Sequence, residues 1–352
     1  MLRFLMTVIG GLLALATLLA LLAPWIPPDQ FWLPLFTAYG FVYLVMAQAL
    51  LIVYWLFRPG RGMWITVLAL LFCLPSLGRH MQFGGSRTTD KKSIQVTTFN
   101  AHALVQLWKT KTKNHKVDPA LIDSLFPDDR RPDILCLQEI PRAYKPEGKD
   151  WGMPAANIYR YRNTVLISRY PLKNKGEKDF AHSGNSIIWA DVQTPLGKVR
   201  VYNAHLQSHR IITKETEILL EAPMNDKNTW KGYRSVLGRV KRSTAMRAEQ
   251  ARWLAEEVAK CTLPVLILGD FNDTPQSYSY RTVAEGLDDS FQCGGSGFGT
   301  TFAGKIPGLR IDYILGGKGI AFLDHHIQRV SLSDHYPVSA RVTFDEKPAN
   351  PE

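Results

Sequence analysis

The sequence predicts an α/β protein in which about three transmembrane helices precede one soluble domain of mixed strands and helices. Two observations lead to this prediction. The first 80 residues hold long runs without any charge, with only four arginines and one acidic residue beside them. Beyond them, short apolar runs separated by turn residues recur up to residue 345, together with one clear amphipathic helix. A mixture of strands and helices over roughly 260 residues is typical of a single α/β domain.

The overall composition excludes several classes of protein. The chain has 352 residues, of which 46% are hydrophobic, and this is enough to bury a large core. A disordered chain, a collagen-like fibre and a disulfide-stapled miniprotein are therefore excluded. The four cysteines show no C-x-x-C or Cys/His spacing, so we expect free thiols and no zinc knuckle. The net charge of +11 suits acidic partners.

Three charge-free runs predict the transmembrane helices. They cover residues 4–24, 31–57 and 62–78. A bilayer core needs about 20 apolar residues in a helix, and the third run, which contains Pro75, is at the short limit. A cleaved signal peptide is the alternative for the first run, but the two later runs would still anchor the chain. We therefore expect residues 1–80 to form a membrane anchor whose partner is the lipid bilayer.

The arginines beside these runs disagree about orientation. Arg58 and Arg61, between the second and third runs, favour a cytoplasmic loop, and Arg79 favours a cytoplasmic domain after the last run. Arg3 favours a cytoplasmic N-terminus, and three crossings would then place the following domain outside the cytoplasm. The charges alone leave both orientations open.

The character of the chain changes after residue 80. Residues 81–92 are polar and contain glycine, which indicates a linker, and residues 346–352 form a short tail. Residues 93–345 are the expected catalytic domain. An amphipathic helix is expected around 251–258 because apolar residues recur there at helical spacing. The expected strands are 94–99, 134–137, 164–168, 186–192, 199–203, 265–268, 310–315 and 339–343.

Acidic, amide and imidazole side chains lie at the ends of these strands, where one sheet edge would gather them into a cleft. Oxygen donors such as Glu139, Asp270 and Asp334 are the ligands that Mg²⁺ prefers. Without a cation, so many carboxylates would raise one another's pKa. A pair such as Asp312 and His335 would orient the imidazole and stabilise its protonated form, as a general base needs. The pattern therefore points to metal-assisted acid–base chemistry.

Six motifs in a fixed order resemble those of the endonuclease/exonuclease/phosphatase superfamily. The similarity is greatest to membrane-anchored bacterial members with several N-terminal spans. The resemblance implies two packed β-sheets flanked by helices, with the site at one end of the sandwich. The motifs are TTFNAH (97–102), LCLQEI (135–140), YNAHLQS (202–208), LILGDFNDTP (266–275), RIDYIL (310–315) and LSDHYPV (332–338).

The resemblance also implies how a metal and a water molecule are held. Glu139 would bind the catalytic Mg²⁺, for which Mn²⁺ would substitute, together with Asn100 and Asp334. Asp270 and Asn272 would position the attacking water and hold phosphate oxygens.

The remaining motif residues are expected to contact the phosphoryl group. His205 would bond the scissile phosphate, and Asn203 beside it is expected to bind substrate. His335, paired with Asp312, would act as the general base or as a cation in the transition state. Whether Asp270 or His335 takes the proton stays open at this point.

A basic stretch at 227–247 is the second candidate feature. Its lysines and arginines alternate with aromatic residues such as Trp230, and Lys231, Arg234 and Arg242 are its expected substrate-binding residues. Such a stretch suits a nucleic-acid backbone or anionic lipid headgroups. A solvated helix face is the alternative interpretation.

Together these features predict a membrane-anchored, divalent-metal-dependent phosphodiesterase of the nuclease or lipid-headgroup type, in which water attacks phosphorus in line. The expected substrate is nucleic acid, a phospholipid or an inositol phosphate headgroup, and the sequence indicates no obligate protein partner. The anchored relatives favour a bacterial cell membrane, with the catalytic domain outside the cytoplasm. The alternative is a non-catalytic binding protein on a retired hydrolase fold. The presence of all the expected metal-binding and catalytic residues named above argues against it.

Overall fold

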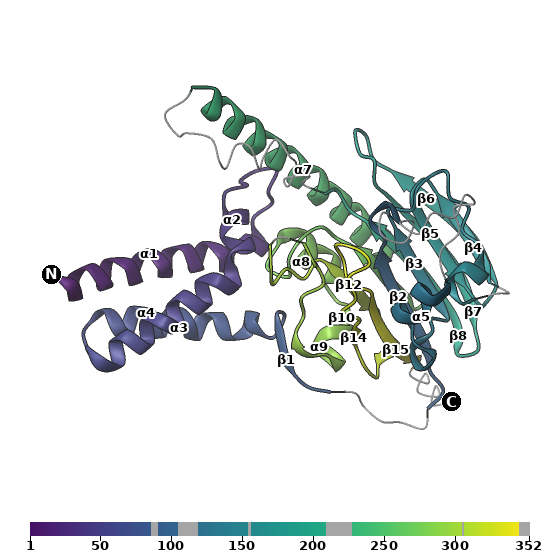
Figure 1. Ribbon diagram of the computed structural model, residues 1–352, viewed down its shortest axis with the longest axis horizontal. Coiled ribbons are helices and arrows are strands. Elements are labelled where there is room, and N and C mark those ends of the chain that lie inside the picture. The colour runs from purple at the N-terminus through teal and green to yellow at the C-terminus, as the bar shows by residue number, and fades with distance from the viewer. Residues whose placement is uncertain (86–90, 105–118, 154–155, 209–226, 305, 345–352) are drawn as a thin grey trace. The chain divides into compact units, whose positions relative to one another are not determined.

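Figure 1 shows a computed structural model of the chain. The chain forms two compact units. The first unit contains Met1–Cys73, Leu206–Leu254 and Gln276–Thr282, and the second contains Leu74–His205, Ala255–Pro275 and Val283–Glu352. The structure describes residues 1–85, 91–104, 119–153, 156–208, 227–304 and 306–344. The expected tail at 346–352 lies outside the described residues.

The first unit opens with apolar helices. These are α1 (Leu2–Leu22), α2 (Pro34–Tyr39), α3 (Phe41–Phe57) and the beginning of α4 (Gly62–Leu77), with a 3₁₀ turn η1 (Ala23–Trp25) after α1. Among the described residues, only the helical stretch Leu2–Trp25 has the length and composition of a membrane span or of a signal sequence.

The prediction of about three transmembrane spans is therefore wrong for the second and third runs. The expected span at 31–57 is divided at Gly40 into the six residues of α2 and the 17 residues of α3. The third run forms the 16 residues of α4, which ends two residues after Pro75. At 1.5 Å per residue, both helices fall short of a bilayer core about 30 Å thick.

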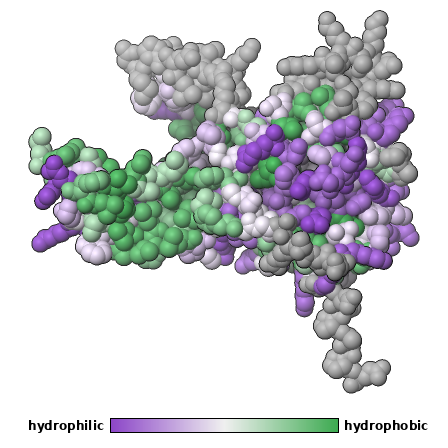
Figure 2. Space-filling view, turned by 60° about the horizontal axis from the view of Figure 1, so that its bottom comes forward, coloured by the Kyte–Doolittle hydropathy of each residue, from purple (hydrophilic) through white to green (hydrophobic). Residues whose placement is uncertain are grey.

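These helices bury some polar side chains and leave many apolar ones exposed. Thr17 and Gln48 are buried together with apolar residues such as Phe41 and Trp55, and Gln48 Nε2 donates to Thr17 Oγ1 at 2.5 Å. Large apolar side chains such as Leu12, Leu50 and Phe72 are exposed, at 63%, 71% and 70%. Figure 2 shows the resulting hydrophobic surface as a continuous green area. Outward apolar and inward polar residues are typical of helices that pack within lipid.

The second unit is built on two β-sheets that pack face to face. The first sheet has the order β10-β12-β9-β8-β7-β6, and its only parallel pair is β8 with β9 among the pairs described. Its strands are β6 (Leu172–Asp179), β7 (Ser186–Thr194), β8 (Gly197–His205), β9 (Val265–Asp270), β10 (Asp288–Asp289) and β12 (Asp312–Gly316).

The second sheet has the order β13-β15-β2-β3-β5-β4, with β14 paired to β15. Here β2 and β3 are parallel and the other pairs are antiparallel. Its strands are β2 (Ile94–Asn100), β3 (Ile134–Gln138), β4 (Asn157–Tyr161), β5 (Thr164–Ser168), β13 (Ile320–Phe322), β14 (His326–Ile327) and β15 (Val338–Phe344).

Alternate residues of the strands build the core between the sheets. Val96 and Cys136 from the second sheet pack with Ile188, Val201 and Leu266 from the first, and all five are fully buried. The outer face of the second sheet forms another apolar cluster with helix α5 (Pro119–Leu125). The expected α/β fold with helix-flanked sheets is therefore confirmed, and each of the eight predicted strands overlaps an observed one. The four cysteines are free thiols, as expected.

The chain also contains the long helix α7 and a two-stranded sheet. The predicted amphipathic helix is the end of α7 (Lys227–Ala259), which begins in the first unit, and α8 (Tyr278–Ala284) follows it along the chain. The expected linker at 81–92 begins as a strand, since β1 (Met81–Phe83) pairs with β11 (Ser296–Phe298).

Candidate active site

The sheet topology brings the strand-end residues to one place in the second unit. Strands β2 and β3 run parallel, as do β8 and β9, and parallel neighbours end at the same sheet edge. Asn100 ends β2, while His205 and Asp270 are register partners at the ends of β8 and β9. Asn100 Nδ2 donates to Asp270 Oδ2 at 2.9 Å, so a hydrogen bond joins the two sheets at this edge.

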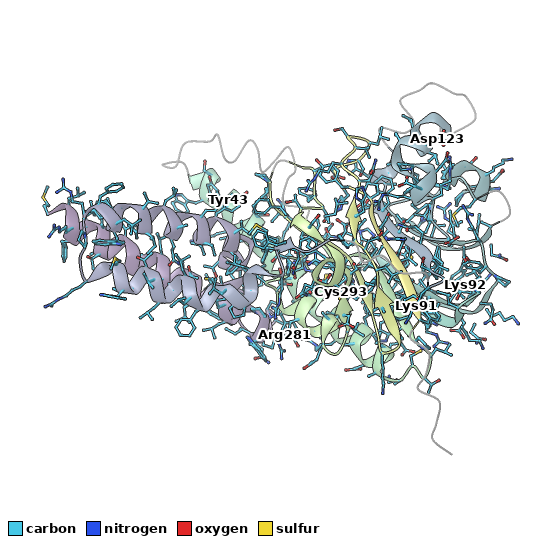
Figure 3. All side chains as sticks on the ribbon, turned by 90° about the horizontal axis from the view of Figure 1, so that it is seen from below. Tyr43, Lys91, Lys92, Asp123, Arg281 and Cys293 are labelled. Atoms are coloured by element: carbon cyan, nitrogen blue, oxygen red, sulfur yellow. The ribbon has the colours of Figure 1, made fainter. Side chains whose placement is uncertain are left out.

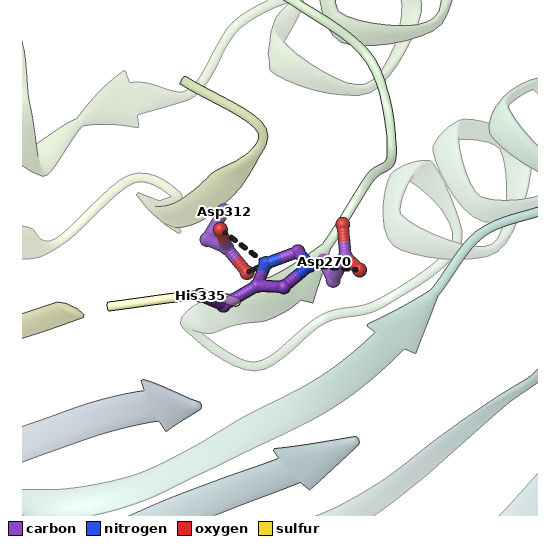
Figure 4. Close-up of side chains that lie close together, drawn as sticks. All are labelled: Asp270, Asp312 and His335. Atoms are coloured by element: carbon purple, nitrogen blue, oxygen red, sulfur yellow. Dashed lines mark hydrogen bonds and ion pairs between the residues drawn. The ribbon is translucent and has the colours of Figure 1, made fainter. Parts of the chain in front are cut away.

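A buried cluster of Asp270, Asp312 and His335 forms the centre of the site (Figure 4). His335 Nδ1 lies 3.1 and 3.0 Å from the two carboxylate oxygens of Asp312. Its Nε2 lies 3.9 Å from Asp270 Oδ2 on the other side of the ring. The three residues are 0%, 1% and 5% exposed. The imidazole is thus fixed between two buried carboxylates.

Burial and charge shift the pKa of both reactive groups in this cluster upward. Burial raises the pKa of Asp270, and the neighbouring charge of Asp312 adds to this effect although the cation of His335 opposes it. Burial alone would lower the pKa of His335, but the charges of Asp312 and Asp270 outweigh it and raise the pKa. His335 therefore holds its proton more readily than an ordinary imidazole, and Asp270 holds a proton more readily than an ordinary carboxyl group.

Amide groups fix the orientation of the Asp270 carboxylate. The backbone N–H of Asn272 donates to Oδ1 at 2.7 Å, and its side-chain Nδ2 donates to Oδ2 at 3.0 Å. With the bond from Asn100, three donors hold this carboxylate. Asn100 Oδ1 in turn accepts the backbone N–H of His102 at 3.0 Å. In this arrangement Asn100 and Asn272 orient Asp270.

Two further carboxylates lie around an imidazole that sequence reasoning missed. His102 Nδ1 is 3.0 Å from Asp334 Oδ1 and 4.0 Å from Glu139 Oε2. These side chains are 47%, 34% and 33% exposed, so this part of the site is open to solvent. The buried His205 has its Nε2 3.8 Å from both Glu139 Oε1 and Asp270 Oδ2, which joins the two parts of the site.

The backbone is strained where these side chains are presented. Glu139, Asn272 and His102 have φ values of 57°, 51° and 44°, in the left-handed region that non-glycine residues rarely adopt. Gly269, just before Asp270, has φ 155°, and a Cβ there would run into the carbonyl group of Ala204. Strain of this kind is concentrated at functional sites, where the surrounding structure holds it.

The charge of the site fits a divalent cation. Four carboxylates, from Glu139, Asp270, Asp312 and Asp334, gather here, and His335 is paired with only two of them, Asp270 and Asp312. Glu139 and Asp334 are partly exposed oxygen donors of the kind that Mg²⁺ or Mn²⁺ takes while it keeps several waters. The residues present therefore suit the metal that the motifs imply.

The other expected site residues have different surroundings. Asn203 is fully buried, and its Nδ2 donates to the carbonyl oxygens of Leu137 and Val165 at 3.1 and 2.8 Å. Its Oδ1 accepts from Gln138 Nε2 at 2.7 Å, so the side chain bridges the two sheets beneath the site. A contact between Asn203 and substrate stays a prediction.

The expected substrate-binding residues on α7 belong to the first unit. Lys231, Arg234 and Arg242 are exposed there, while the strand-end residues all belong to the second unit. Their role in substrate binding also stays a prediction.

Comparisons with known proteins agree with the motifs. A family model described as the endonuclease/exonuclease/phosphatase family matches residues 98–335, and a domain of unknown function matches residues 3–80. A search of curated proteins finds no match.

Solved structures of the same fold are similar over most of the chain. A member of that family from Bacteroides thetaiotaomicron is 16% identical with a TM-score of 0.51, and the match covers 73% of this chain and 100% of the other. A mannosyl-6-phosphatase from the same organism is also 16% identical, with a TM-score of 0.50 and coverage of 72% and 100%. The human Nocturnin catalytic domain with bound sulfate is 15% identical, with a TM-score of 0.49 and coverage of 73% and 96%.

Proposed function

Because the chain belongs to the endonuclease/exonuclease/phosphatase family, whose members are phosphoesterase hydrolases, we propose that it is a membrane-anchored, divalent-metal-dependent enzyme that hydrolyses a phosphoric ester. One observation carries the proposal. His335 is held between two buried carboxylates at the same strand edge as the partly exposed Glu139 and Asp334. This arrangement supports the proposal, because it would set a proton donor and a carboxylate beside oxygens that would hold a cation.

The partly exposed carboxylates would hold the metal. Glu139 and Asp334 would supply its protein ligands, with Asn100 nearby, and the bound cation would neutralise charge on the phosphate and polarise it toward attack. Mg²⁺ is the expected ion, with Mn²⁺ as a substitute. His102 lies beside both carboxylates, 3.0 Å from Asp334 and 4.0 Å from Glu139.

The raised pKa values of Asp270 and His335 support one choice of general base and of cation. Asp270 has a raised pKa and is oriented by three hydrogen-bond donors, so it would take the proton of the attacking water. His335 already carries a proton, since Asp312 stabilises its cationic form, and would therefore stabilise the charge that develops on the phosphoryl oxygens. His205, between Asp270 and Glu139, would bond the same phosphoryl group.

The many exposed apolar side chains of the N-terminal helices support the membrane anchor. In α3, for example, Leu50 is 71% exposed while the polar Gln48 is buried, whereas a helix in water exposes its polar residues first. An enzyme held at a bilayer meets substrates of that bilayer at a high local concentration. This favours a phospholipid or another lipid-linked phosphoester as the substrate, and a nuclease-type diester is the second choice.

Hydrolysis by the full chain tests the proposal. The protein would be incorporated into nanodiscs with Mg²⁺ and offered bis(p-nitrophenyl) phosphate, p-nitrophenyl phosphate, plasmid DNA, RNA, phosphatidylinositol and inositol phosphates. We expect hydrolysis of at least one diester that stops with EDTA and in the His335→Ala variant. Hydrolysis that persists in chelator would refute the metal mechanism. A chain that binds Mg²⁺ but leaves every substrate intact would favour the non-catalytic binding protein.

A further inference from the structure

The first half of α7 carries a row of exposed basic residues. Lys231, Arg234, Lys241 and Arg242 are all exposed, and no acidic residue occurs between positions 227 and 248. Arg234 and Lys241 are seven residues apart, so they project from the same side of the helix. The charge on this part of the helix is therefore of one sign.

Exposed apolar side chains accompany this row. Trp230 is 53% exposed and Leu237 is 40% exposed, and these two residues are also seven positions apart. The Trp230 ring contacts Tyr233 with ring centroids 6.2 Å apart. A helix that presents Lys and Arg beside Trp and Leu is typical of helices that lie in the plane of a membrane surface.

Polar contacts join α7 to the segment that follows the apolar helix α1. Arg252 Nη2 bonds Asp29 Oδ2 at 3.1 Å, four residues after the apolar stretch Leu2–Trp25 ends. The buried Arg247 donates through Nη2 to the hydroxyl of Tyr39, at the end of α2, at 3.4 Å. All of these residues belong to the first unit, so α7 is fixed where the apolar helix ends.

The segment around α8 makes contacts of the same kind. Arg281, labelled in Figure 3, places its guanidinium 3.4 Å from the centroid of the Trp25 ring. Gln276 Nε2 donates to the carbonyl oxygen of Ala20, in the last turns of α1, at 3.1 Å. These contacts also lie within the first unit and hold the chain just before and within α8 at the end of α1.

Aromatic residues mark this end of α1 as a membrane–water boundary. Trp25 is 63% exposed, Phe31 is 47% exposed, and Trp32 follows directly. Aromatic side chains gather at the level of lipid headgroups, where one part of the ring meets lipid and another meets water. The helix that carries the basic row thus contacts, through Arg247 and Arg252, the part of the chain that these aromatic residues would place among headgroups.

We infer that the first half of α7 lies on the membrane surface and binds anionic phospholipid headgroups through Lys231, Arg234 and Arg242. The inference rests on the membrane anchoring in the proposed function and goes beyond it. Charge complementarity and continuity with the apolar helices select the bilayer as the partner, since a negatively charged leaflet attracts basic residues that are held close to it. These side chains then hold the enzyme on lipid and do not bind the scissile group.

Amide hydrogen exchange of α7 in nanodiscs tests the inference. The full chain would be incorporated into nanodiscs of phosphatidylcholine alone and into nanodiscs that also contain phosphatidylglycerol. We expect exchange within 227–245 to slow several-fold with the anionic lipid. In the variant K231Q/R234Q/R242Q this slowing should be lost. The control variant K173Q/K175Q/K198Q, which removes three exposed lysines of the second unit, should keep it.

Each other outcome has a definite meaning. Equal exchange in the two kinds of nanodisc would overturn the inference. Slowing by a DNA oligonucleotide but not by phosphatidylglycerol would overturn it in favour of nucleic acid. A chain that carbonate extracts from membranes would disprove the anchor itself, which separates that failure from a failure of headgroup binding. Hydrolysis that stops in the His335→Ala variant would stand in all of these cases.

Discussion

Charged side chains lie buried around Asp270 in the second unit, whereas apolar side chains of α1, α3 and α4 lie exposed in the first. Both regions depart from the ordinary distribution of residues in a water-soluble protein, and they do so in opposite directions. Buried charge is unfavourable unless it is paired, so its presence points to chemistry. Exposed apolar surface is unfavourable in water, so its extent points to lipid. The same rule of burial thus supports the proposed reactive site in one unit and the proposed membrane contact in the other.

The largest effect is expected from removal of the buried base. Asp270→Asn should lower kcat by about 10²–10⁴-fold, because the water loses its proton acceptor. The same change should leave thermal stability unchanged or raise it, since burial disfavours the charged form of Asp270 in the folded chain. Steady-state kinetics and thermal unfolding measure the two effects.

Asp191 provides a matched control for this change. It is also a buried acidic residue, but its partner is Arg200, whose Nε lies 2.7 Å from Asp191 Oδ1. Neither of these two residues belongs to the candidate site. Asp191→Asn should lower stability and keep kcat. A variant at Asp270 that unfolds several degrees lower with normal kcat would show that Asp270 is structural.

A charge introduced among the exposed apolar side chains of the N-terminal helices tests the proposed membrane contact. Leu12→Arg places a cation near the middle of α1, which would oppose membrane insertion by about 2.5–3.5 kcal/mol if this helix spans the bilayer. In a water-exposed helix the same change would alter stability by only about 0.5 kcal/mol. The fraction of chain left in carbonate-washed membranes measures the difference. Phe298→Arg, at an exposed position of the second unit, should leave that fraction unchanged.

The metal requirement is expected to respond to Glu139. Glu139→Gln removes one carboxylate of the proposed ligand set and should raise the Mg²⁺ concentration for half-maximal activity roughly 10–100-fold. Calorimetric titration of Mg²⁺ should show the same loss of affinity without substrate. Glu177→Gln, at an exposed carboxylate of β6, is the control. An unchanged Mg²⁺ profile in Glu139→Gln would reject this residue as a ligand.

The strands were predictable where they are buried and not where they are exposed. The runs at 134–137 and 265–268 became β3 and β9 because both faces of these strands are covered, so the whole run is apolar. Strand β6 (LKNKGEKD) was missed, since exposed lysines fill it and its register shifts between Lys173 and Gly176. The break between α2 and α3 at Gly40 could not be predicted from the run at 31–57. The run is apolar on both sides of the break, so its composition does not show where one helix ends.

The site residues also differ in how far the sequence predicts them. Their place at a strand end could be predicted, but contacts that depend on packing could not. Residues at strand ends were predictable because topology alone gathers them, as Asp270 and His205 show. His102 was missed because its position depends on a left-handed turn after Asn100. Asn203 could not be distinguished from its motif neighbours, since only the packing of two sheets turns its amide toward Leu137 and Val165.

The smallest expected effect is a shift in the pH dependence of activity, which tests the separate roles of Asp270 and His335. Activity needs an ionised Asp270 and a protonated His335, so it should rise as pH passes the first pKa and fall as pH passes the second. Both pKa values are raised, which places the acid limb above the ordinary carboxyl value of about 3.9 and the alkaline limb above the ordinary imidazole value of about 6.5. The pH dependence of kcat/KM measures both limbs.

Asp312→Asn should move both limbs to lower pH. The charge of Asp312 raises the pKa of Asp270 and that of His335, and the amide keeps the shape of the side chain without that charge. Asp324→Asn, at a buried carboxylate bound to Arg341, should leave both limbs in place. If only the acid limb moves, His335 is not the titrating cation. If neither moves, the buried cluster does not control the proton transfers, and the buried charge around Asp270 then has no role in the chemistry.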